Sequence, residues 1–409
     1  MNIGMVLNTP FPPDIRVEKE ARSLIRAGHK VYLLTSLLEN RPQQEDIDGI
    51  TVKRISSIEQ IPFVKRKLIS LKFYLTFIDE FWQKEIEEFV DTFNINVLHV
   101  HDLLMVGTSI KVAKKKCIPI IADLHENYPF ALQIWRYSRN RNLKEKVIDK
   151  LFNNLSRWIN YEKKWLQEVN HIIVVVDEAK KRIMKYEIPP EKITVLMNVE
   201  DLDYFNNVEY DVSILKNYKE QKAFIVSYIG GFAYHRGLDV AIKAITFIRK
   251  EISNIKLLLV GAKKNSYLET LKKCIQKLKA EDVVEIVSWQ PFDKIATYIK
   301  ISDVCLVPHH RNPHTDSTIP HKLFQYMLMG KPVIVSNCRP LKRIIEETQA
   351  GLVFQAGNAC DLAHKIIFLY KNYNLRERYG IQGRRMVSQK YNWGKESEKL
   401  LLLYRKITN

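Results

Sequence analysis

Residues 303–337 limit the possible folds of this chain more than any other stretch. Residues 304–307 form a short apolar run followed by a proline, which is typical of a buried parallel strand. The polar residues 309–317 come next, and Thr318 then offers a good N-cap for a helix that ends at Gly330. A second apolar run begins directly after that helix. The order of strand, polar loop, helix and strand predicts an α/β domain built on a parallel sheet.

The start of the predicted helix is suited to binding an anion. Free backbone N–H groups and the positive end of the helix dipole lie there, at the carboxyl end of a parallel strand. Pro320 fits the first turn, and Lys322 adds a full positive charge to it. Gln325 lies one turn further on and can hydrogen-bond a sugar hydroxyl, while His314 and Asp316 supply polar groups in the preceding loop. These residues predict a site for a ligand that carries both a diphosphate and hydroxyl groups.

Residues 314–327, HTDSTIPHKLFQYM, resemble the donor site of the family-4 retaining glycosyltransferases of the GT-B fold, in the branch whose motif is HTDxTIPHKLFQYM. The resemblance implies that a nucleoside diphosphate sugar binds here, with Thr318 and Ile319 also among the donor-binding residues. The commoner motif of the family has two glutamates eight residues apart, and this chain has Ser317 and Gln325 at those positions. The roles of the two carboxylates therefore do not carry over.

A glycine-containing loop is predicted to face the same ligand. Residues 223–229 read as a strand, and Gly230 and Gly231 after it allow backbone amides to approach a ligand closely. Arg236 precedes the next helix and can hold a phosphate with two hydrogen bonds. The family usually has an arginine directly after the first glycine and a lysine five residues later, where this chain has Gly231 and Arg236. Arg236 and Lys322 are therefore expected to meet at the leaving diphosphate.

The first half of the chain predicts another parallel sheet. Residues 3–7 and 31–36 read as strands on either side of a helix at 16–27, which together form a βαβ unit. The crossover has no GxGxxG motif, so the dinucleotide-binding fingerprint is absent. Arg16, at the start of this helix, is expected either to bind an acceptor phosphate or to be an ordinary surface arginine.

Two histidines lie at the ends of predicted strands in this first half. His101 ends the strand at 97–102, and His125 follows the strand at 118–122. Sheets of this class bind ligands at the carboxyl ends of their strands. The resemblance implies that His125 reaches the reacting sugar and the acceptor, and that it shares the catalytic role with the two cations of the donor loops. His101 is assigned to acceptor binding or to holding its loop, and either histidine has the alternative of a buried structural group.

The resemblance extends over nearly the whole chain and implies the GT-B fold, which has two Rossmann-like, doubly wound parallel-sheet domains facing an interdomain cleft. We expect an N-terminal acceptor-binding domain at residues 1–205, a linker at 206–222 and a C-terminal nucleotide-sugar-binding domain at 223–390. Residues 391–409 are expected to form a final helix that crosses back to the first domain.

The net charge of +18 is concentrated in the second half, where residues 223–409 contain 30 Lys and Arg against 15 Asp and Glu. Such a field attracts anionic ligands, although a generally basic surface is an equal alternative. Residues 135–166 hold nine Lys and Arg, three Asp and Glu and three tryptophans, which indicates a basic helix able to lie on an anionic membrane. The alternative is a charged outer helix whose tryptophans pack on the sheet.

No segment reads as a signal peptide or as an apolar run of the ~18 residues that span a bilayer. We therefore expect a cytoplasmic protein that can associate with the inner face of the cell membrane. The five cysteines are scattered and have no metal-ligand spacing, so neither a metal nor a cofactor is expected. No helix-turn-helix, RNP or zinc signature points to nucleic acid as a partner.

Together these features predict a metal-independent retaining enzyme that moves a hexosyl group from a nucleoside diphosphate sugar to a hydroxyl of a glycan or lipid-linked acceptor. The setting that the resemblance implies is the synthesis of cell-surface polysaccharide, lipopolysaccharide or glycolipid. The alternative is a catalytically inactive GT-B protein that binds or activates a partner transferase, because Ser317 and Gln325 replace both carboxylates.

Overall fold

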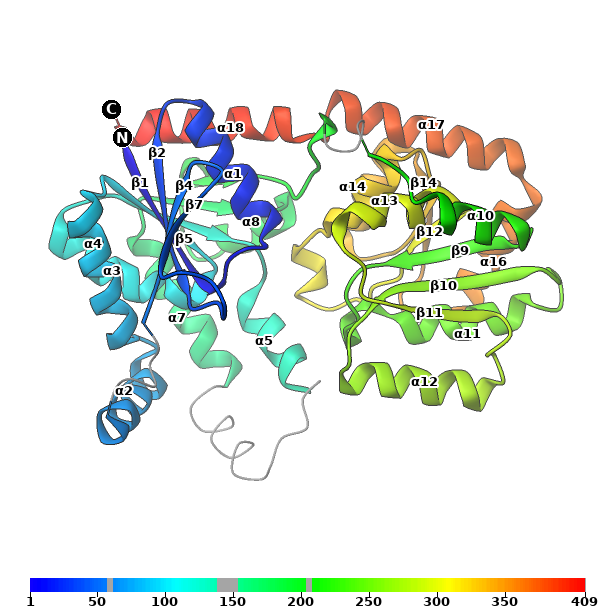
Figure 1. Ribbon diagram of the computed structural model, residues 1–409, viewed down its shortest axis with the longest axis horizontal. Coiled ribbons are helices and arrows are strands. Elements are labelled where there is room, and N and C mark those ends of the chain that lie inside the picture. The colour runs from blue at the N-terminus through cyan, green and yellow to red at the C-terminus, as the bar shows by residue number, and fades with distance from the viewer. Residues whose placement is uncertain (57–61, 138–153, 204–207, 409) are drawn as a thin grey trace. The chain divides into compact units, whose positions relative to one another are not determined.

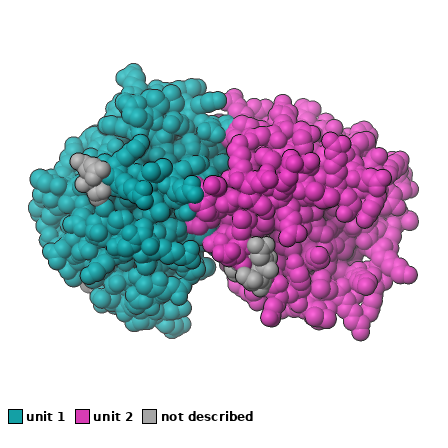
Figure 2. All heavy atoms as spheres, turned by 90° about the horizontal axis from the view of Figure 1, so that it is seen from above, with its two compact units in different colours: residues 1–133, 141–197, 396–409 teal, residues 134–140, 198–395 magenta. Residues whose placement is uncertain are grey.

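The computed structural model describes residues 1–56, 62–137, 154–203 and 208–408, and the chain divides into two compact units (Figure 1). Unit 1 comprises residues 1–133, 141–197 and 396–409, and unit 2 comprises residues 134–140 and 198–395. The two units are coloured separately in Figure 2. Each has its own sheet, and each is described by itself below.

Unit 1 is built on an eight-stranded sheet with the order β3-β4-β2-β1-β5-β6-β7-β8. The strand pairs are parallel except for β3 with β4, which is antiparallel. The strands are β1 (Asn2–Pro10), β2 (Lys30–Ser36), β3 (Gln44–Ile47), β4 (Ile50–Arg54), β5 (Val97–His101), β6 (Ile120–Leu124), β7 (His171–Val174) and β8 (Ile193–Val195). The register of β5 and β6 places His101 opposite Asp123, which brings their side chains to one end of the sheet.

The helices of the first half follow the strands in α/β order. They are α1 (Ile15–Arg26), α2 (Phe63–Thr76), α3 (Glu80–Phe93), α4 (Val106–Lys116), α5 (Tyr128–Tyr137), α7 (Leu155–Glu168) and α8 (Asp177–Met184). Helix α1 begins where the carboxylate of Asp14 accepts hydrogen bonds from the backbone N–H groups of Arg16 and Val17. The predicted βαβ unit at the start of the chain is confirmed by β1, α1 and β2.

Unit 2 has a six-stranded sheet, all parallel, with the order β11-β10-β9-β12-β13-β14. The strands are β9 (Phe224–Ile229), β10 (Ile255–Ala262), β11 (Val284–Ser288), β12 (Val304–Val307), β13 (Val333–Ser336) and β14 (Gly351–Phe354). The helices are α10 (Val212–Glu220), α11 (Leu238–Ile248), α12 (Ser266–Leu278), α13 (Phe292–Ile301), α14 (His321–Leu328), α15 (Arg339–Thr348), α16 (Ala359–Lys371) and α17 (Tyr373–Gln389). Helices α11 and α12 cover one face of the sheet, and α13 and α14 cover the other (Figure 1).

The prediction of two parallel-sheet α/β domains is confirmed, and the stretch 303–337 has the expected order as β12, α14 and β13. One local prediction is wrong, because Thr318 does not cap the helix. A short 3-10 turn at Thr315–Ser317 precedes it, and the hydroxyl of Thr318 donates to the carbonyl of His314 (3.2 Å). Helix α14 therefore begins at His321, with Pro320 in the N-cap position. Helix α10 lies inside the segment that was expected to link the domains.

The last helix, α18 (Trp393–Thr408), belongs to unit 1 from residue 396 onward. Its buried side chains Leu400, Leu403 and Tyr404 pack into that unit. Among the helices of the described residues, none is both long and apolar enough to cross a bilayer.

The segment 135–166, for which the sequence left membrane binding and packing on the sheet open, is only partly described, because residues 138–153 lie outside the described ranges. Helix α7 belongs to that segment, and its tryptophans point into unit 1. Trp158 is 2% exposed and stacks on Phe77 with ring centroids 4.1 Å apart, and Trp165 is also buried. In α7 the packing alternative is therefore the one that the structure shows.

Candidate active site

The donor-side residues predicted from the sequence meet at the carboxyl ends of β9 and β12 in unit 2. Gly230 follows β9 with φ of 138°, which favours glycine. A Cβ atom at this position would collide with Nζ of Lys322, which lies against the loop from the first turn of α14. A Cβ atom on Gly231 would meet nothing within 4 Å, so the loop is open beside this residue. The positive φ at residue 230 therefore favours glycine, and the Lys322 side chain occupies the space that a Cβ atom would need.

Lys322 is a buried cation. Its side chain reaches over the ring of Tyr228, with Nζ 3.4 Å from the ring centroid. Among the described residues, Nζ has no hydrogen-bond partner. Burial and the positive charge of Arg236 both lower the pKa of Lys322 well below its usual value. A buried ammonium without a counter-charge is costly, so this position is suited to an anionic ligand that would supply one.

Arg236 ends the short turn Tyr234–Arg236 before α11 and is the second cation of this site. Its Nη1 lies 3.2 Å from Nε2 of His309, and among the described residues it makes no ion pair with a carboxylate. Burial, and after it the charge of Arg236, lowers the pKa of His309 well below its usual value and that of His314 to about 3. Both imidazoles are therefore neutral, and His309 contacts the guanidinium without cancelling its charge.

The loop before α14 is braced largely by its own side chains. Asp316 accepts hydrogen bonds from Nε of Arg311 (3.1 and 3.2 Å) and from the backbone N–H of Arg339 at the start of α15 (2.9 Å). The carboxylate of Asp316 thus holds the loop in place. Ile319 is buried, and its carbonyl accepts a hydrogen bond from the side-chain amide of Asn198 (3.1 Å).

Gln325 has a partner that the sequence analysis missed. Its Nε2 donates to Oε1 of Glu200 (3.2 Å), and Nδ1 of His321 lies 2.9 Å from the same oxygen. Glu200 is 3% exposed and comes shortly after β8, at the point where the chain enters unit 2. The only sequence signal was its position a few residues after the apolar run that forms β8. Because the amide nitrogen of Gln325 donates to Glu200, it is the carbonyl oxygen of this side chain that can accept a hydrogen bond from a hydroxyl group.

A second polar cluster lies in unit 1 at the ends of β5 and β6. Arg16 is 4% exposed, so the alternative of a surface arginine is wrong. It donates to both oxygens of Asp123 (Nη2–Oδ1 2.9 Å, Nε–Oδ2 3.2 Å) and to the carbonyl of Leu196 (3.0 Å). Its Nε also lies 3.0 Å from Oε1 of Glu20, one turn along α1. The guanidinium is thus held by the protein itself, with two carboxylates around it.

The structure brings His101 and His125 together beside Asp123. Nε2 of His125 lies 3.1 Å from Oδ2 of Asp123 and 3.2 Å from Nδ1 of His101. Burial alone would lower the pKa of His125, but the carboxylates of Asp102 and Asp123 outweigh it and raise this pKa to about 10. Burial lowers the pKa of His101 to about 3. His125 is therefore an imidazolium at neutral pH, whereas His101 is neutral.

Glu20 and His99 complete the cluster, and the sequence analysis did not name them. Together with His101 and Asp123 they offer four ligand atoms within 4.8 Å of one another, all buried, which is the composition of a metal site. The guanidinium of Arg16, however, already lies against both carboxyl groups and is the cationic partner of Asp123. In the sequence, only spacing could have indicated these two residues. Glu20 lies four residues after Arg16, and His99 lies two residues before His101.

The charges of this cluster predict that stability depends on pH. The pKa of His125 is raised from 6.5 to about 10, so its stabilising contribution is complete below pH 6.5 and is lost as the pH rises to about 10. Burial raises the pKa of Glu20 from 4.5 to about 8. The stabilising contribution of its protonated carboxyl group is therefore lost as the pH rises from 4.5 to 8. In urea titrations at several pH values, we expect His125→Asn to remove part of the decline in the free energy of unfolding, above all between pH 8 and 10. The exposed His364→Asn is the control, and equal slopes for wild type and His125→Asn would contradict the assignment.

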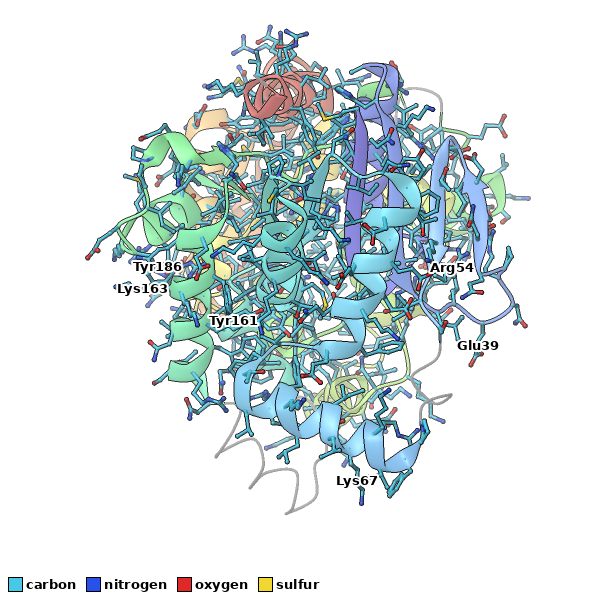
Figure 3. The ribbon with its side chains drawn as sticks, turned by 90° about the vertical axis from the view of Figure 1, so that its left-hand side faces the viewer. Glu39, Arg54, Lys67, Tyr161, Lys163 and Tyr186 are labelled. Atoms are coloured by element: carbon cyan, nitrogen blue, oxygen red, sulfur yellow. The ribbon has the colours of Figure 1, made fainter. Side chains whose placement is uncertain are left out.

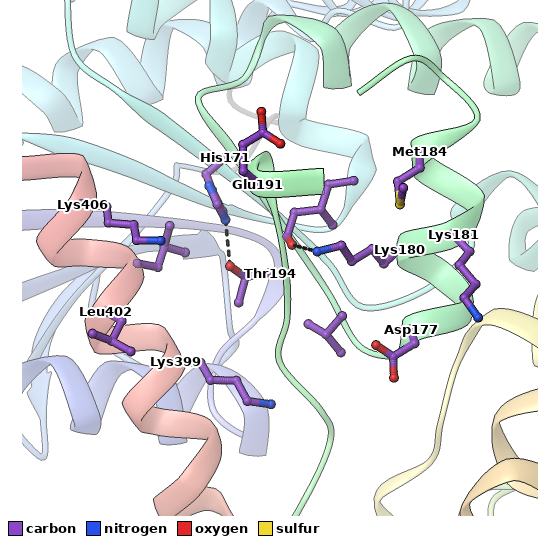
Figure 4. A pocket seen from close by; sticks show the side chains of 13 residues that line it. His171, Asp177, Lys180, Lys181, Met184, Glu191, Thr194, Lys399, Leu402 and Lys406 are labelled. Carbon is purple, nitrogen blue, oxygen red and sulfur yellow. Dashed lines mark hydrogen bonds between the residues drawn. The ribbon is translucent and has the colours of Figure 1, made fainter. Parts of the chain in front are cut away.

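A separate hollow of about 650 Å³ lies in unit 1 beside β8, between α8 and α18 (Figure 4). Its lining includes His171 and Thr194, whose side chains lie 2.8 Å apart, and Lys180, which donates to the carbonyl of Ile193 (2.8 Å). Further lysines of the lining are Lys181, Lys399 and Lys406. None of the candidate site residues lines this hollow, so it is distinct from the cluster around Asp123.

Comparisons with known proteins agree with this division of the chain. The family model of glycosyltransferase family 4 matches residues 15–204, and the model of glycosyl transferases group 1 matches residues 212–386. An uncharacterized glycosyltransferase of Methanocaldococcus jannaschii is 23% identical over 99% of this chain and 98% of its own. The alpha-monoglucosyldiacylglycerol synthase of Streptococcus pneumoniae is 20% identical over 90% of this chain and 78% of its own. The solved structure of Anabaena HepE in complex with UDP-glucose matches with a TM-score of 0.70 and 13% identity, and it covers 99% of both chains.

Proposed function

Because the chain belongs to the family-4 glycosyltransferases of the GT-B fold, we propose that it moves a hexosyl group from a nucleoside diphosphate sugar to an acceptor hydroxyl with retention at the anomeric carbon. The observation that carries the proposal is the buried Lys322 ammonium, which lies against the Gly230 loop without an anionic partner among the described residues. A diphosphate is the group that this position is built to receive.

Departure of the nucleoside diphosphate is the step that the donor side assists. Negative charge builds up on the leaving phosphate as its bond to the sugar breaks. Lys322, Arg236 and the backbone amides at Gly230 and Gly231 are placed to stabilise that charge. Because two side-chain cations supply the positive charge, we propose that the reaction needs neither a metal nor another cofactor.

The remaining donor contacts follow from the geometry of α14 and its loop. We assign the carbonyl oxygen of Gln325 to a ribose hydroxyl, because Glu200 already binds the amide nitrogen. His314, Thr318 and Ile319 are assigned to the sugar and its phosphate. Asp316 supports these contacts indirectly by fixing the loop.

On the acceptor side, His125 is proposed as a positively charged hydrogen-bond donor. An imidazolium has no lone pair with which to take a proton, so His125 does not serve as the general base. The acceptor oxygen bonds to the anomeric carbon, the bond from that carbon to the phosphate oxygen breaks, and the departing diphosphate takes the acceptor proton. Arg16 and His101 hold His125 and Asp123 in position, and a phosphate on the acceptor would have to compete with Asp123 for Arg16.

We further propose that the acceptor is a glycan or a lipid-linked molecule presented at the cytoplasmic face of the cell membrane. The synthase of Streptococcus pneumoniae supports this setting, since its name describes the glucosylation of a diacylglycerol lipid. Synthesis of cell-surface polysaccharide, lipopolysaccharide or glycolipid is the proposed pathway class. A second candidate, a protein that binds a donor and activates a partner transferase, is favoured by Ser317 and Gln325 at the two carboxylate positions.

A thermal-shift panel of nucleoside diphosphates and their sugars, with and without EDTA, tests the donor proposal. We expect the melting temperature to rise with the nucleotides of one base, and to rise equally with and without EDTA. In Arg236→Ala we expect no rise. The exposed Lys342→Ala is the matched control and should respond as wild type does. The absence of a shift with every nucleotide would overturn the donor site. A shift without release or transfer of sugar would favour the second candidate.

A further inference from the structure

Helix α2 exposes a continuous apolar stripe. Val64, Leu68, Leu71 and Leu75 are 70%, 54%, 51% and 56% exposed, and their spacing of four, three and four residues places them on one side of the helix. Ile69 is buried on the side that faces unit 1. The helix therefore has more apolar surface than it needs for packing, and the excess is gathered in one line.

Lysines flank this stripe on both sides. By helical spacing, Lys65 and Lys72 lie along one flank and Lys67 lies along the other, where Figure 3 shows it directed away from the rest of unit 1. All three are exposed, and Lys72 lies 2.8 Å from Glu80 of α3. Helix α2 contains no acidic residue. An apolar centre between two cationic margins is the pattern of a helix that lies in the surface of a negatively charged membrane.

We propose that α2 docks unit 1 on an anionic membrane, with the stripe among the acyl chains and the flanking lysines at the lipid phosphates. The inference rests on the proposed membrane-presented acceptor and names the surface that contacts the membrane. The basic and aromatic helix α7 does not expose its tryptophans, whereas α2 exposes its leucines. From residue 64 to residue 75 the stripe is roughly 17 Å long, which suits a helix lying in the membrane surface and is too short to span a bilayer.

A second copy of the chain is a less suitable partner for the same surface. If two α2 stripes packed together, the lysines of each would meet the lysines of the other, and like charges at an interface oppose association. Anionic lipid headgroups complement the lysines on both flanks at once.

Co-flotation with vesicles tests the proposal. We expect the wild type to float with vesicles of phosphatidylglycerol and phosphatidylcholine, and to float much less with phosphatidylcholine alone. The double variant Leu68→Ser, Leu71→Ser should lower the partition coefficient about tenfold or more, because two exposed side chains no longer enter the acyl region. The control is Phe247→Ser, Ile381→Ser, which removes two apolar side chains of unit 2 that are at least as exposed as Leu71 and should leave flotation unchanged. The melting temperatures and the nucleotide-induced shifts of all variants verify that they are folded.

The outcomes separate this inference from the proposals on which it rests. If the wild type fails to float while its nucleotide shift is intact, membrane docking is overturned and the donor site stands. If the wild type and the α2 variant float equally, the assignment to α2 is overturned although membrane association remains. If sedimentation shows a dimer that the α2 variant converts to a monomer, the stripe is a contact between two copies of the chain and the membrane assignment is wrong.

Discussion

Replacing Lys322 by methionine should abolish donor binding and at the same time stabilise the unliganded protein. The ammonium is buried and has no counter-charge among the described residues, so an apolar side chain of similar length removes a desolvation cost. We expect the free energy of unfolding to rise by about 1–3 kcal/mol. We expect the affinity for the diphosphate to fall by about 10²–10³-fold, as is typical when one partner of a desolvated charge pair is lost. Urea titration and isothermal calorimetry measure the two effects on the same preparation.

Two further variants make the result specific. Lys322→Arg keeps a cation, but its larger head group meets the loop at Gly230, so we expect binding to be weakened less than in the methionine variant. The exposed Lys342→Met should change neither quantity appreciably. Because burial lowers the pKa of Lys322 and a bound phosphate would raise it, donor binding should take up protons at any pH where the unliganded lysine is partly deprotonated. Calorimetry in two buffers of different ionisation enthalpy detects this uptake. Unchanged affinity together with lower stability in Lys322→Met would overturn the role of this lysine.

Asp123→Asn should strongly destabilise unit 1. Its carboxylate contacts Arg16 and His125 in a fully buried position, and the charges of these two groups hold the pKa of Asp123 well below its usual range although burial opposes this. An amide leaves both cations buried without this counter-charge, which costs about 3–5 kcal/mol. Urea unfolding at neutral pH measures the loss. A histidine NMR titration should also show a lower pKa for His125, because the variant lacks a carboxylate that raises it.

Glu20→Gln is the matched control for this experiment. Glu20 is equally buried and also contacts Arg16, but its pKa is raised to about 8, so it is largely protonated at neutral pH. A neutral amide resembles a protonated carboxyl group, and we expect a change of only about 1 kcal/mol. Equal losses in the two variants would show that Asp123 does not carry the charge of this cluster.

The sequence predicted the donor loops well because their signals are local. A strand, a polar loop and a helix start follow one another within about thirty residues, and each has its own residue preferences. The misplaced N-cap at Thr318 has an equally local cause, since the hydroxyl of Thr318 donates to the carbonyl of His314 and the chain makes a 3-10 turn before α14. The tendency of threonine to cap helices does not determine which of two nearby backbone groups its hydroxyl will bond.

The sequence could not reveal the partners that come from distant parts of the chain. Glu200 meets Gln325 across 125 residues, and His99 meets Tyr404 across 305 residues. No periodicity or spacing connects such pairs, because they are brought together by the order of strands in a sheet and by the path of the last helix. For the same reason the sequence left open whether the tryptophans of residues 135–166 face a membrane or pack on the sheet, since composition does not show which side of a helix is buried.

The position of the last helix also determines when each part of the protein can be finished during synthesis. Glu396 accepts the backbone N–H of Met197 (2.9 Å), and the hydroxyl of Tyr404 lies 2.8 Å from Nδ1 of His99, so α18 completes unit 1. Residues 396–409 are synthesised after the rest of unit 1 and after unit 2. Unit 2 has all its residues once residue 395 has emerged, whereas unit 1, which is started first, waits for the final helix. The contact between Tyr404 and His99 beside Asp123 is thus made only in chains translated through Tyr404.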